Sequence, residues 1–298
     1  HCMKFDNIVG NPPYQDTNKR NTTPHKLWID FTKKSFSDWL KDGGYLLQVS
    51  PSSFSSPSSK ILQLFKDKQT HIINFNQEQH FPDVATTVAT YVIENVVSNN
   101  TTIINNKFTI NLDSSVLYIP NDFCQESFSI HSKTMFSTQP KLNVERDYVT
   151  GHNIRLKDKN PTLSKEKTEH HIYPMFHSNR QVWYSTILQP FAKEKKVIWT
   201  RSGYTKPFYD NGKFGVTDLS YYVRVANDTE GKDLSHNLNT RLFEYIFATA
   251  RWSGFGNDKV FYALPQLPNK KFTNNEMYDL FGLTKKEILY VESNTKGN

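Results

Sequence analysis

The chain has 298 residues, a length that corresponds to about two domains. It carries 36 Lys and Arg against 29 Asp and Glu, a net charge of +7, and 14% of its residues are aromatic. The aromatic content and the modest charge exclude a disordered acidic chain. No apolar run approaches the ~20 residues that span a bilayer, and two cysteines are too few for a disulfide framework or a Cys-based zinc site. We expect a soluble, cytoplasmic, mildly basic protein that does not act in a membrane.

The positive charge is unevenly distributed along the chain. Residues 1–96 carry 10 basic and 9 acidic residues, a net charge of +1, whereas residues 97–298 carry 26 and 20, a net charge of +6. The residue pattern changes at the same place. The sequence therefore predicts two domains, 1–96 and 97–298, with the basic character in the second.

The first part alternates between strand and helix patterns. Apolar and β-branched runs predict strands at Phe5–Val9, Tyr45–Ser50, Ile72–Phe75 and Thr86–Glu94. Apolar residues at helical spacing predict helices at His25–Lys41 and Ile61–Lys66. Gly43-Gly44 is expected to end the first helix as a C-cap pair. Strands separated by helices indicate a mostly parallel α/β sheet.

The second part lacks this alternation, which favours an α+β domain. Thr101–Ile119 is expected to form two short strands, Val197–Thr200 and Tyr221–Val225 are strand-like, and Leu238–Ala250 is helical. Two capping boxes open the last two helices, with their members at Thr273 and Glu276, then at Thr284 and Glu287.

The most informative segment is the loop that follows the first strand. Asn11-Pro12-Pro13-Tyr14 stands directly after Phe5–Val9 and Gly10, at a strand's carboxyl end, where open α/β sheets place their ligands. A Pro-Pro turn with an Asn cap would explain these residues without any function. The preceding strand and the terminal aromatic residue favour a chemical role.

These residue types suit transfer to an amino group that is conjugated with a ring. Such an amino group is a poor nucleophile because its lone pair is delocalised. The Asn11 side-chain oxygen and the Pro12 backbone carbonyl can accept its two hydrogens and draw it toward a tetrahedral geometry. Tyr14 offers a flat face on which the ring can stack. Positioning and electrostatics then accelerate the transfer without a metal.

The tetrapeptide Asn11-Pro12-Pro13-Tyr14 resembles the catalytic motif of amino-group methyltransferases that use S-adenosylmethionine. DNA adenine-N6 enzymes, glutamine-N5 enzymes that act on release factors, and some ribosomal RNA enzymes share this motif. The resemblance implies S-adenosylmethionine as the cofactor and catalytic roles for all four residues. It specifies the reaction type better than the substrate.

Two further stretches are similar to γ-class DNA adenine methyltransferases. Leu27-Trp28 with Phe31, and Leu40–Phe54 with its Gly43-Gly44 pair, resemble the helix and strand that follow the motif in that class. His80-Phe81-Pro82-Asp83-Val84 resembles its target-base motif. The resemblance implies that Phe81 packs with Tyr14 against a flipped adenine. As a lone residue beside a Pro turn, Phe81 would equally suit an ordinary core position.

The second part resembles the target-recognition domains of the same class more loosely, through Lys195–Phe208, Asn237–Leu242, Trp252–Phe255 and Tyr278–Tyr290. The resemblance implies a fold of a partial Rossmann-like methyltransferase sheet followed by an α+β target-recognition domain. It also implies double-stranded DNA as a partner.

Basic residues lie among aromatic ones in this second part, and phosphate contacts supply much of the affinity for DNA. The candidate DNA-binding residues are Arg201, Lys206, Lys195, Lys196 and Arg251. Ordinary solvated charges would explain many of them.

The γ-class places a glycine-rich cofactor motif well before the catalytic loop, but only ten residues precede Asn11. Gly254-Phe255-Gly256 is the closest alternative, and a loop explains it better. The S-adenosylmethionine site is therefore expected to be incomplete, with an N-terminal segment or a second chain supplying the cofactor motif. Without such a partner, Phe5–Val9 and Tyr45–Ser50 would leave an open, apolar sheet edge, so we expect either that a partner covers this edge or that the first domain is rearranged. His170, His171 and His177 match no zinc spacing, so no metal site is expected.

Together these observations predict an adenine-specific DNA methyltransferase of a restriction–modification system, in which this chain carries the catalytic loop and the target-recognition portion. Two alternatives stay open. The chain could be a non-catalytic DNA-recognition subunit or inactive paralogue that retains the loop. A protein-glutamine methyltransferase is disfavoured by the long basic second part.

Overall fold

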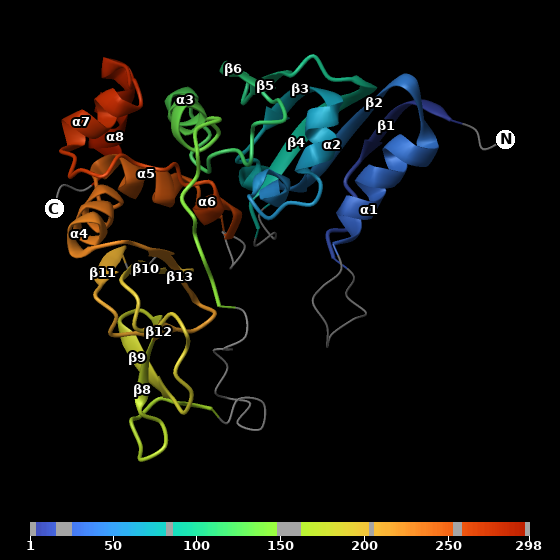
Figure 1. The fold of residues 1–298 in the computed structure, drawn as a ribbon. Coiled ribbons are helices and arrows are strands. Elements are labelled where there is room, and N and C mark those ends of the chain that lie inside the picture. The colour runs from blue at the N-terminus through green and yellow to red at the C-terminus, as the bar shows by residue number, and fades with distance from the viewer. Residues whose placement is uncertain are drawn as a thin grey trace. The chain divides into compact units, whose positions relative to one another are not determined.

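The computed structural model describes residues 4–15, 26–81, 86–147, 162–202, 206–252 and 258–295. The chain divides into two compact units, His1–Ser132 and Lys133–Asn298, which are described separately below (Figure 1). Sequence patterns placed the boundary at residue 96, but the structure places it 36 residues further along the chain. The strands β5 and β6 that follow residue 96 pair with the first sheet, and this pairing accounts for the shift.

The N-terminal unit is built on one six-stranded sheet. Its strands, in spatial order, are β1 (Phe5–Gly10), β2 (Leu40–Pro51), β4 (Val88–Val97), β3 (Lys68–Asn74), β5 (Thr101–Ile104) and β6 (Phe108–Asn111). The predicted α/β fold class is confirmed, but the sheet is mixed rather than mostly parallel. Only β1–β2 and β3–β5 are parallel neighbours, because β4 lies between β2 and β3 and runs antiparallel to both.

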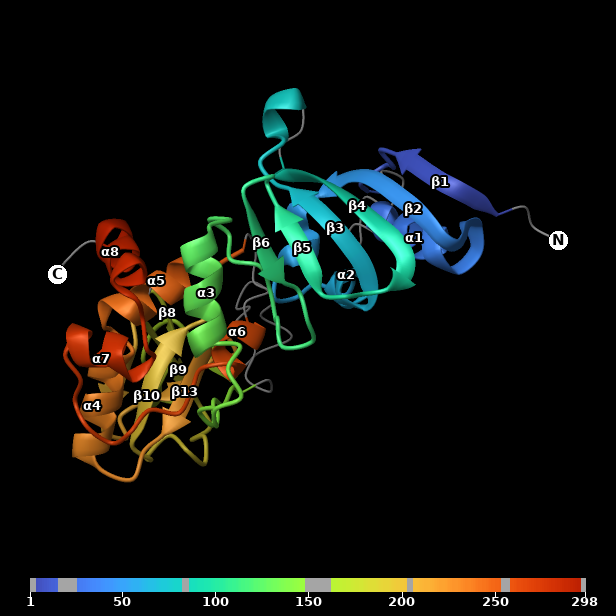
Figure 2. The ribbon, with the colours of Figure 1, turned by 90° about the horizontal axis from the view of Figure 1, so that it is seen from above.

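Helices cover one face of this sheet (Figures 1 and 2). These are α1 (Leu27–Lys34), the π-helical turn η1 (Ser35–Trp39) and α2 (Leu62–Asp67). Tyr91 of β4 meets both helices: its ring packs edge-on against Phe65 of α2 at 4.8 Å, and its hydroxyl lies 3.4 Å from Thr32 of α1. The core of the unit therefore lies between these helices and the sheet.

The predicted glycine cap of the first helix is wrong. The helical turns end at Trp39, and Gly43 and Gly44 lie inside β2. Leu40, which is fully buried, already pairs with Phe5 of β1. A Cβ atom on Gly44 would stand 3.0 Å from the Asp6 carbonyl oxygen, so the glycine allows β1 to approach β2 closely.

The C-terminal unit contains two small sheets and five helices within its described residues. One sheet has the order β11 (Phe208–Asp210), β10 (Lys196–Thr200), β13 (Ser220–Arg224). The other has the order β12 (Gly215–Val216), β8 (Tyr173–Ser178), β9 (Gln181–Ser185), β7 (Leu163–Ser164). The helices are α4 (Asp228–Asn237), α5 (Arg241–Thr249), α6 (Asp258–Tyr262), α7 (Asn274–Leu280) and α8 (Lys285–Asn294), while α3 (Gln125–Thr134) spans the boundary between the units.

Both predicted capping boxes are confirmed. Thr273 and Glu276 close the N-terminus of α7 reciprocally, and Thr284 and Glu287 do the same for α8. In the core, Ile198 of β10 packs with Phe176, Phe191 and Tyr222 from the surrounding strands and loops. Helix length and hydropathy across the described residues give no candidate for a membrane-spanning helix.

Candidate functional site

The connections that follow β1, β2 and β3 all leave the sheet at the same end. β1 is parallel to β2, and β4 runs antiparallel to both β2 and β3, so the three strands point the same way. The Asn11–Tyr14 loop after β1 therefore shares one end of the sheet with the segment that leads from β3 to Phe81. This is the end at which open α/β sheets bind ligands.

A cavity of about 450 Å³ lies along the sheet face opposite the helices and reaches Asn11. Its lining residues come from the four strands β1 to β4 and are Val9, Gly10, Asn11, Leu47, Gln48, Val49, Ile72, Asn74, Thr90, Tyr91 and Val92. Val9, Leu47 and Val92 form one cross-strand row. Asn11 itself is exposed, which leaves its side-chain amide accessible.

Tyr14 points back toward the sheet core. Its hydroxyl oxygen is buried and has no hydrogen-bond partner among the described residues, and burial raises its pKa. Burial also raises the pKa of Tyr91 to about 12, and the charge of Tyr14 adds to that rise. The ring of Tyr14 remains partly exposed. Its stacking role stays a prediction.

A buried polar chain that the sequence analysis did not identify lies below this loop. Gln48, which pairs with Gly10 of β1, donates from Nε2 to Oγ1 of Thr32 at 2.9 Å. Thr32 donates in turn to the Trp28 carbonyl and lies 3.4 Å from the Tyr91 hydroxyl. Buried polar groups that satisfy one another fix a single local arrangement. The available signal was a glutamine inside the apolar run of β2.

Phe81 follows the 3₁₀ turn η3 (Glu78–His80) and is partly exposed. Its backbone N–H donates to the Glu78 carbonyl at 2.8 Å, and the Glu78 carboxylate accepts from the Val88 backbone N–H at 2.9 Å. The described residues include no ring contact between Phe81 and the Asn11–Tyr14 loop. Pro82, Asp83 and Val84 of the target-base motif lie outside the described residues.

The expected open apolar edge is confirmed. Within the described residues β1 pairs only with β2, so its other side is the sheet edge. Val9 is 77% exposed and Phe5 is 46% exposed on this strand, and Leu47 beside Val9 is 37% exposed. An exposed apolar edge strand is a surface that proteins normally cover.

The cavity beside Asn11 does not by itself fit S-adenosylmethionine. Its lining offers the Asn11 and Asn74 amides and the Thr90 hydroxyl, but none of the lining residues is a carboxylate that could hold ribose hydroxyls. The residues present instead suit the substrate side of a group transfer, where two oxygen atoms accept hydrogen bonds from an amino group.

The prediction that Lys196 binds DNA is wrong. Its side chain is fully buried, its Nζ lies 2.9 Å from the Asp210 carboxylate, and it donates to the carbonyls of Ala192 and Glu194. Its position as the first residue of β10 turns it into the core, so it does not reach a phosphate. Lys195, the next residue toward the N-terminus, is exposed and pairs with Asp228 at 2.6 Å.

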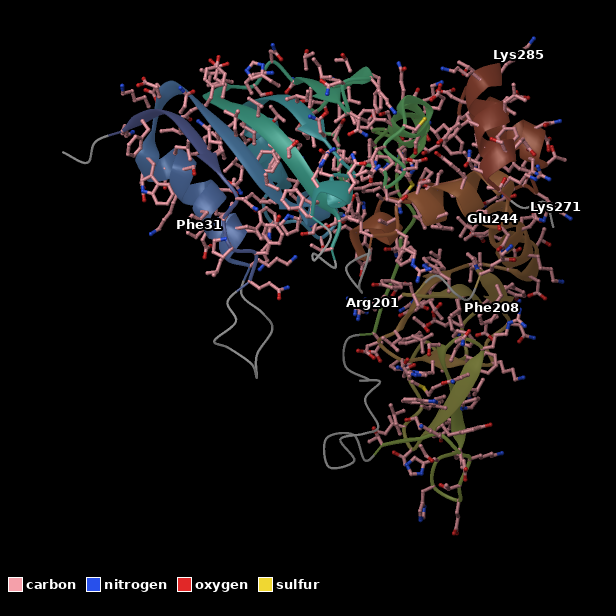
Figure 3. All side chains as sticks on the ribbon, turned by 180° about the vertical axis from the view of Figure 1, so that it is seen from behind. Phe31, Arg201, Phe208, Glu244, Lys271 and Lys285 are labelled. Atoms are coloured by element: carbon pink, nitrogen blue, oxygen red, sulfur yellow. The ribbon has the colours of Figure 1, made fainter. Side chains whose placement is uncertain are left out.

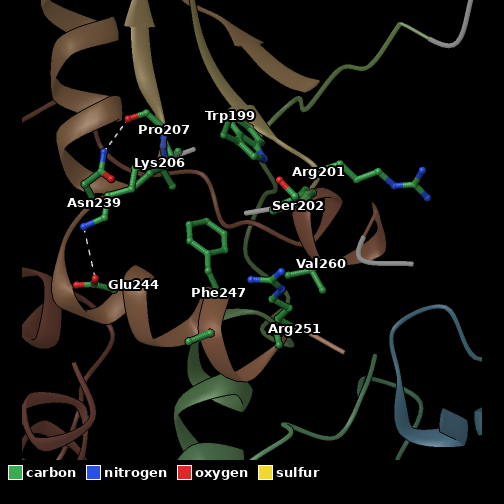
Figure 4. Close-up of a pocket in the computed structure, with 14 residues that line it drawn as sticks. Trp199, Arg201, Ser202, Lys206, Pro207, Asn239, Glu244, Phe247, Arg251 and Val260 are labelled. Atoms are coloured by element: carbon green, nitrogen blue, oxygen red, sulfur yellow. Dashed lines mark hydrogen bonds and ion pairs between the residues drawn. The ribbon is translucent and has the colours of Figure 1, made fainter. Parts of the chain in front are cut away.

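The other three basic candidates lie together. Arg201, Lys206 and Arg251 all line one cavity of about 220 Å³ in the C-terminal unit (Figure 4). Lys206 forms an exposed ion pair with Glu244 at 3.4 Å. Gly203 and Tyr204, which follow Arg201 closely in the chain, and Gly254-Phe255-Gly256 lie outside the described residues.

The histidines take structural positions. His177 stacks on Trp183 with ring centroids 3.5 Å apart and hydrogen-bonds Thr217. His171 is partly exposed, and its side chain hydrogen-bonds Thr168. Where the chain is described, no group of three or more His, Cys, Asp or Glu side chains is arranged to hold a metal ion.

Comparison with known proteins addresses the first unit most directly. Residues 1–81 match the model of the Eco57I restriction-modification methylase family. The match includes the Asn11–Tyr14 loop and Phe81. No curated protein sequence matches the chain.

Solved structures of restriction–modification proteins resemble the chain at low identity. A chain of a type I restriction–modification system shares 17% identity at a TM-score of 0.27, covering 34% of this chain and 23% of its own. The M protein of the type I enzyme EcoKI shares 15% at 0.26, covering 31% and 21%. The ATP-dependent type ISP enzyme LlaBIII bound to DNA shares 9% at 0.40, covering 96% and 29%. The present chain thus spans less than a third of the length of each.

Proposed function

We propose that this chain supplies the catalytic loop and the target-recognition portion of a restriction–modification DNA methyltransferase that methylates the N6 amino group of a flipped adenine. The observation that carries the proposal is the Asn11-Pro12-Pro13-Tyr14 loop at the carboxyl end of β1, inside the stretch that matches the methylase family model. The exposed Asn11 amide at the mouth of an apolar cavity supports it.

In the proposed mechanism Asn11 and Pro12 do the chemical work of this chain. The Asn11 side-chain oxygen and the Pro12 carbonyl each accept one hydrogen of the adenine amino group. Because both hydrogens are then held outside the ring plane, the lone pair localises on the nitrogen. It could then attack an electrophilic methyl group. Acceptors that are already oriented cost no reorganisation in the transition state. Pro12 and Pro13 keep the backbone fixed while this happens.

Tyr14 and Phe81 are proposed to hold the flipped base. Removing an adenine from the duplex costs a few kcal/mol, which stacking against aromatic rings offsets in part. Both rings are partly exposed at the end of the sheet that carries Asn11. The buried Gln48–Thr32–Tyr91 chain below the loop would keep Tyr14 in one position.

S-adenosylmethionine is the proposed methyl donor, and residues outside the Asn11 cavity would hold it. A segment or second subunit that covers the exposed β1 edge and the neighbouring face of the sheet is the proposed source of those residues. The support is the apolar exposure of Val9 and Leu47 next to the Asn11–Tyr14 loop, and of Phe5 at the other end of β1. A partner that buries this edge would complete the sheet and enclose the cavity from the same side.

The C-terminal unit is proposed to bind double-stranded DNA. Residues 133–298 carry 25 basic and 17 acidic residues, a net charge of +8, whereas residues 1–132 carry 11 and 12, a net charge of −1. A net positive charge favours association with the phosphate backbone. Arg201, Lys206, Arg251 and Lys195 remain the proposed phosphate contacts.

A non-catalytic DNA-recognition subunit is the second candidate, and the incomplete lining of the Asn11 cavity favours it. A methyl-transfer assay with tritiated methyl groups separates the two functions. The protein is the native holoenzyme, which includes the segment or subunit that covers β1. The acceptor is either duplex DNA or a release-factor protein. We expect label in DNA, lost at least 100-fold in Asn11→Ala and retained in the control Asn111→Ala, which alters an exposed asparagine of β6. Duplex binding without transfer would favour the recognition subunit, and label only in protein would overturn the DNA assignment.

A further inference from the structure

A second cavity lies wholly within the C-terminal unit, between β10, α5 and α6 (Figure 4). Its volume of about 220 Å³ is below the range of roughly 300–1,000 Å³ that drug-sized ligands occupy. A single planar ring system with one small substituent matches that size better than an extended ligand does.

Aromatic side chains form one part of the cavity lining. Trp199 of β10 and Phe247 of α5 both pack edge-on or tilted against Phe261 of α6, with centroids 5.8 Å and 6.0 Å from it. Figure 4 shows Trp199 and Phe247 on facing sides of the cavity. A flat ring that enters between them can stack on an aromatic face.

One polar atom in this wall is left for a ligand. Trp199 is 2% exposed, and its indole N–H has no hydrogen-bond partner among the described residues. A buried donor without a partner costs about 1–3 kcal/mol. A ligand oxygen or ring nitrogen in the cavity would accept this hydrogen bond and remove the cost.

Positive charge forms the other part of the lining. Arg201, Lys206 and Arg251 line the cavity against one carboxylate, Glu244. The Lys206–Glu244 pair is exposed and 3.4 Å long, so it contributes little stability and can open. Figure 4 shows Lys206 directed toward Glu244 on one side of the cavity, Arg201 extending away on the opposite side, and Arg251 next to Phe247. An anionic group beside Phe247 would therefore meet Arg251, and arginine suits a phosphate particularly well.

We propose that this cavity binds one unstacked nucleotide, with its base between Trp199 and Phe247 and its phosphate against Arg251. The proposal rests on the DNA-binding role proposed above and deepens it: the C-terminal unit would grip a base that has left the helix in addition to contacting the duplex backbone. Stacking plus cationic contact is the usual chemistry of single-nucleotide capture. A free nucleoside monophosphate carries the same chemistry.

Two substitutions test the cavity, one by removing a ring from its lining and one by filling it. Phe247→Ala removes a partly buried stacking face, and Ala248→Phe fills the cavity from an exposed position on α5. Arg251→Ala removes a lining charge. Lys285→Ala is the charge-matched control, because Lys285 is exposed at the start of α8 and Figure 3 shows it extending away from the unit, far from Arg201.

Binding is measured by fluorescence anisotropy on the full chain with three probes: a fully paired duplex, the same duplex with a one-nucleotide bulge, and labelled AMP. We expect the wild type to prefer the bulged duplex about tenfold, and Phe247→Ala and Ala248→Phe to abolish that preference. Affinity for the paired duplex should change less than twofold. Arg251→Ala should weaken AMP binding about fivefold, whereas Lys285→Ala leaves it within twofold.

The three probes distinguish a nucleotide within DNA from a free nucleotide. They also distinguish failure of the cavity proposal from failure of the DNA-binding proposal. AMP binding that both cavity variants abolish, without a bulge preference, assigns the cavity to a free nucleotide. Paired-duplex binding with neither a bulge preference nor AMP binding overturns the nucleotide cavity but leaves the DNA-binding function intact. AMP binding without duplex binding overturns the DNA-binding function and leaves the cavity. Equal effects of Ala248→Phe on all three probes would contradict a dedicated site.

Discussion

The two units differ in where their polar and charged side chains lie. In the N-terminal unit a buried polar chain through Gln48, Thr32 and Tyr91 supports an exposed loop, and the adjoining strand edge is apolar and uncovered. In the C-terminal unit a buried ion pair, Lys196 with Asp210, lies in the core, while Arg201, Lys206 and Arg251 line a partly aromatic cavity. The first unit thus has the form of a reaction site that needs a cover, and the second of a charged binding surface.

The charge balance follows the same division. The N-terminal unit carries a net charge of −1 and the C-terminal unit carries +8, so the whole positive excess belongs to the unit without the Asn-Pro-Pro-Tyr loop. A catalytic loop that meets a flipped base needs little net charge, because its work is local hydrogen bonding. A surface that follows a phosphate backbone needs a net positive charge. The difference agrees with the proposed roles, methyl transfer in the first unit and DNA binding in the second.

The largest stability effect is expected in the core of the C-terminal unit. Lys196→Met leaves the Asp210 carboxylate buried without its cation, so the free energy of unfolding should fall by about 3–5 kcal/mol. Lys195→Met removes only an exposed ion pair and should cost less than about 1 kcal/mol. Chemical denaturation followed by tryptophan fluorescence measures both. Equal losses in the two variants would remove the distinction between a core lysine and a surface lysine.

The next largest effect is expected on S-adenosylmethionine affinity, when a substitution prevents the β1 edge from being covered. Val9→Lys places a charge on a strand whose edge we propose to be buried in the holoenzyme, so S-adenosylmethionine affinity should fall at least 100-fold by calorimetry. Val97→Lys is the matched control, since Val97 is 88% exposed at the end of β4. The stability of the chain alone should be unaffected by either change. Unaltered cofactor affinity in Val9→Lys would show that the edge stays exposed to solvent.

A pH dependence should distinguish the N-terminal unit. His131 is buried against Tyr118, and desolvation lowers its pKa from 6.5 to about 3. Below pH 6.5 the unfolded chain binds a proton that the folded unit does not, so stability present above pH 6.5 falls as the pH drops toward 3. The slope contributed by this residue is at most about 1.4 kcal/mol per pH unit. His131→Gln should remove it in urea titrations between pH 7 and 4, whereas the exposed-site variant His80→Gln should keep it.

The smallest effect concerns salt. Arg201→Ala and Arg251→Ala should each reduce the slope of log affinity against log salt for duplex DNA by about one unit, if each contacts one phosphate. Lys285→Ala, on α8, should leave the slope unchanged. Filter binding between 50 and 200 mM salt measures this. A slope that is identical in all four proteins would contradict the assignment of the recognition surface to the Arg201–Arg251 cavity.

Local sequence signals predicted local structure well. The strand Phe5–Val9 ends at Gly10 as expected, and both capping boxes form, because their determinants lie within a few residues of each other. The direction of β4 could not be predicted in this way. An apolar run predicts a strand, but its neighbours are fixed by packing between residues distant in the chain, and β4 lies antiparallel between β2 and β3.

The same limit applies to the site. The position of Asn11 after a strand could be predicted, as could the apolar edge. Basic residues in sequence do not reveal which way they point: Lys195 and Lys196 are neighbours, yet one is exposed and the other is fully buried. The polar chain under the loop was missed because Gln48, Thr32 and Tyr91 come from two strands and a helix that only the fold brings together.

The central claim is that the Asn11–Tyr14 loop directs methylation of adenine at N6 in DNA. The most direct test incubates the native holoenzyme with duplex DNA and S-adenosylmethionine, digests the DNA, and identifies the methylated nucleoside by mass spectrometry. The account predicts N6-methyladenine, reduced at least 100-fold in Asn11→Ala and unchanged in Asn111→Ala. Methylation of cytosine, or N6-methyladenine formed at the wild-type rate by Asn11→Ala, would contradict it.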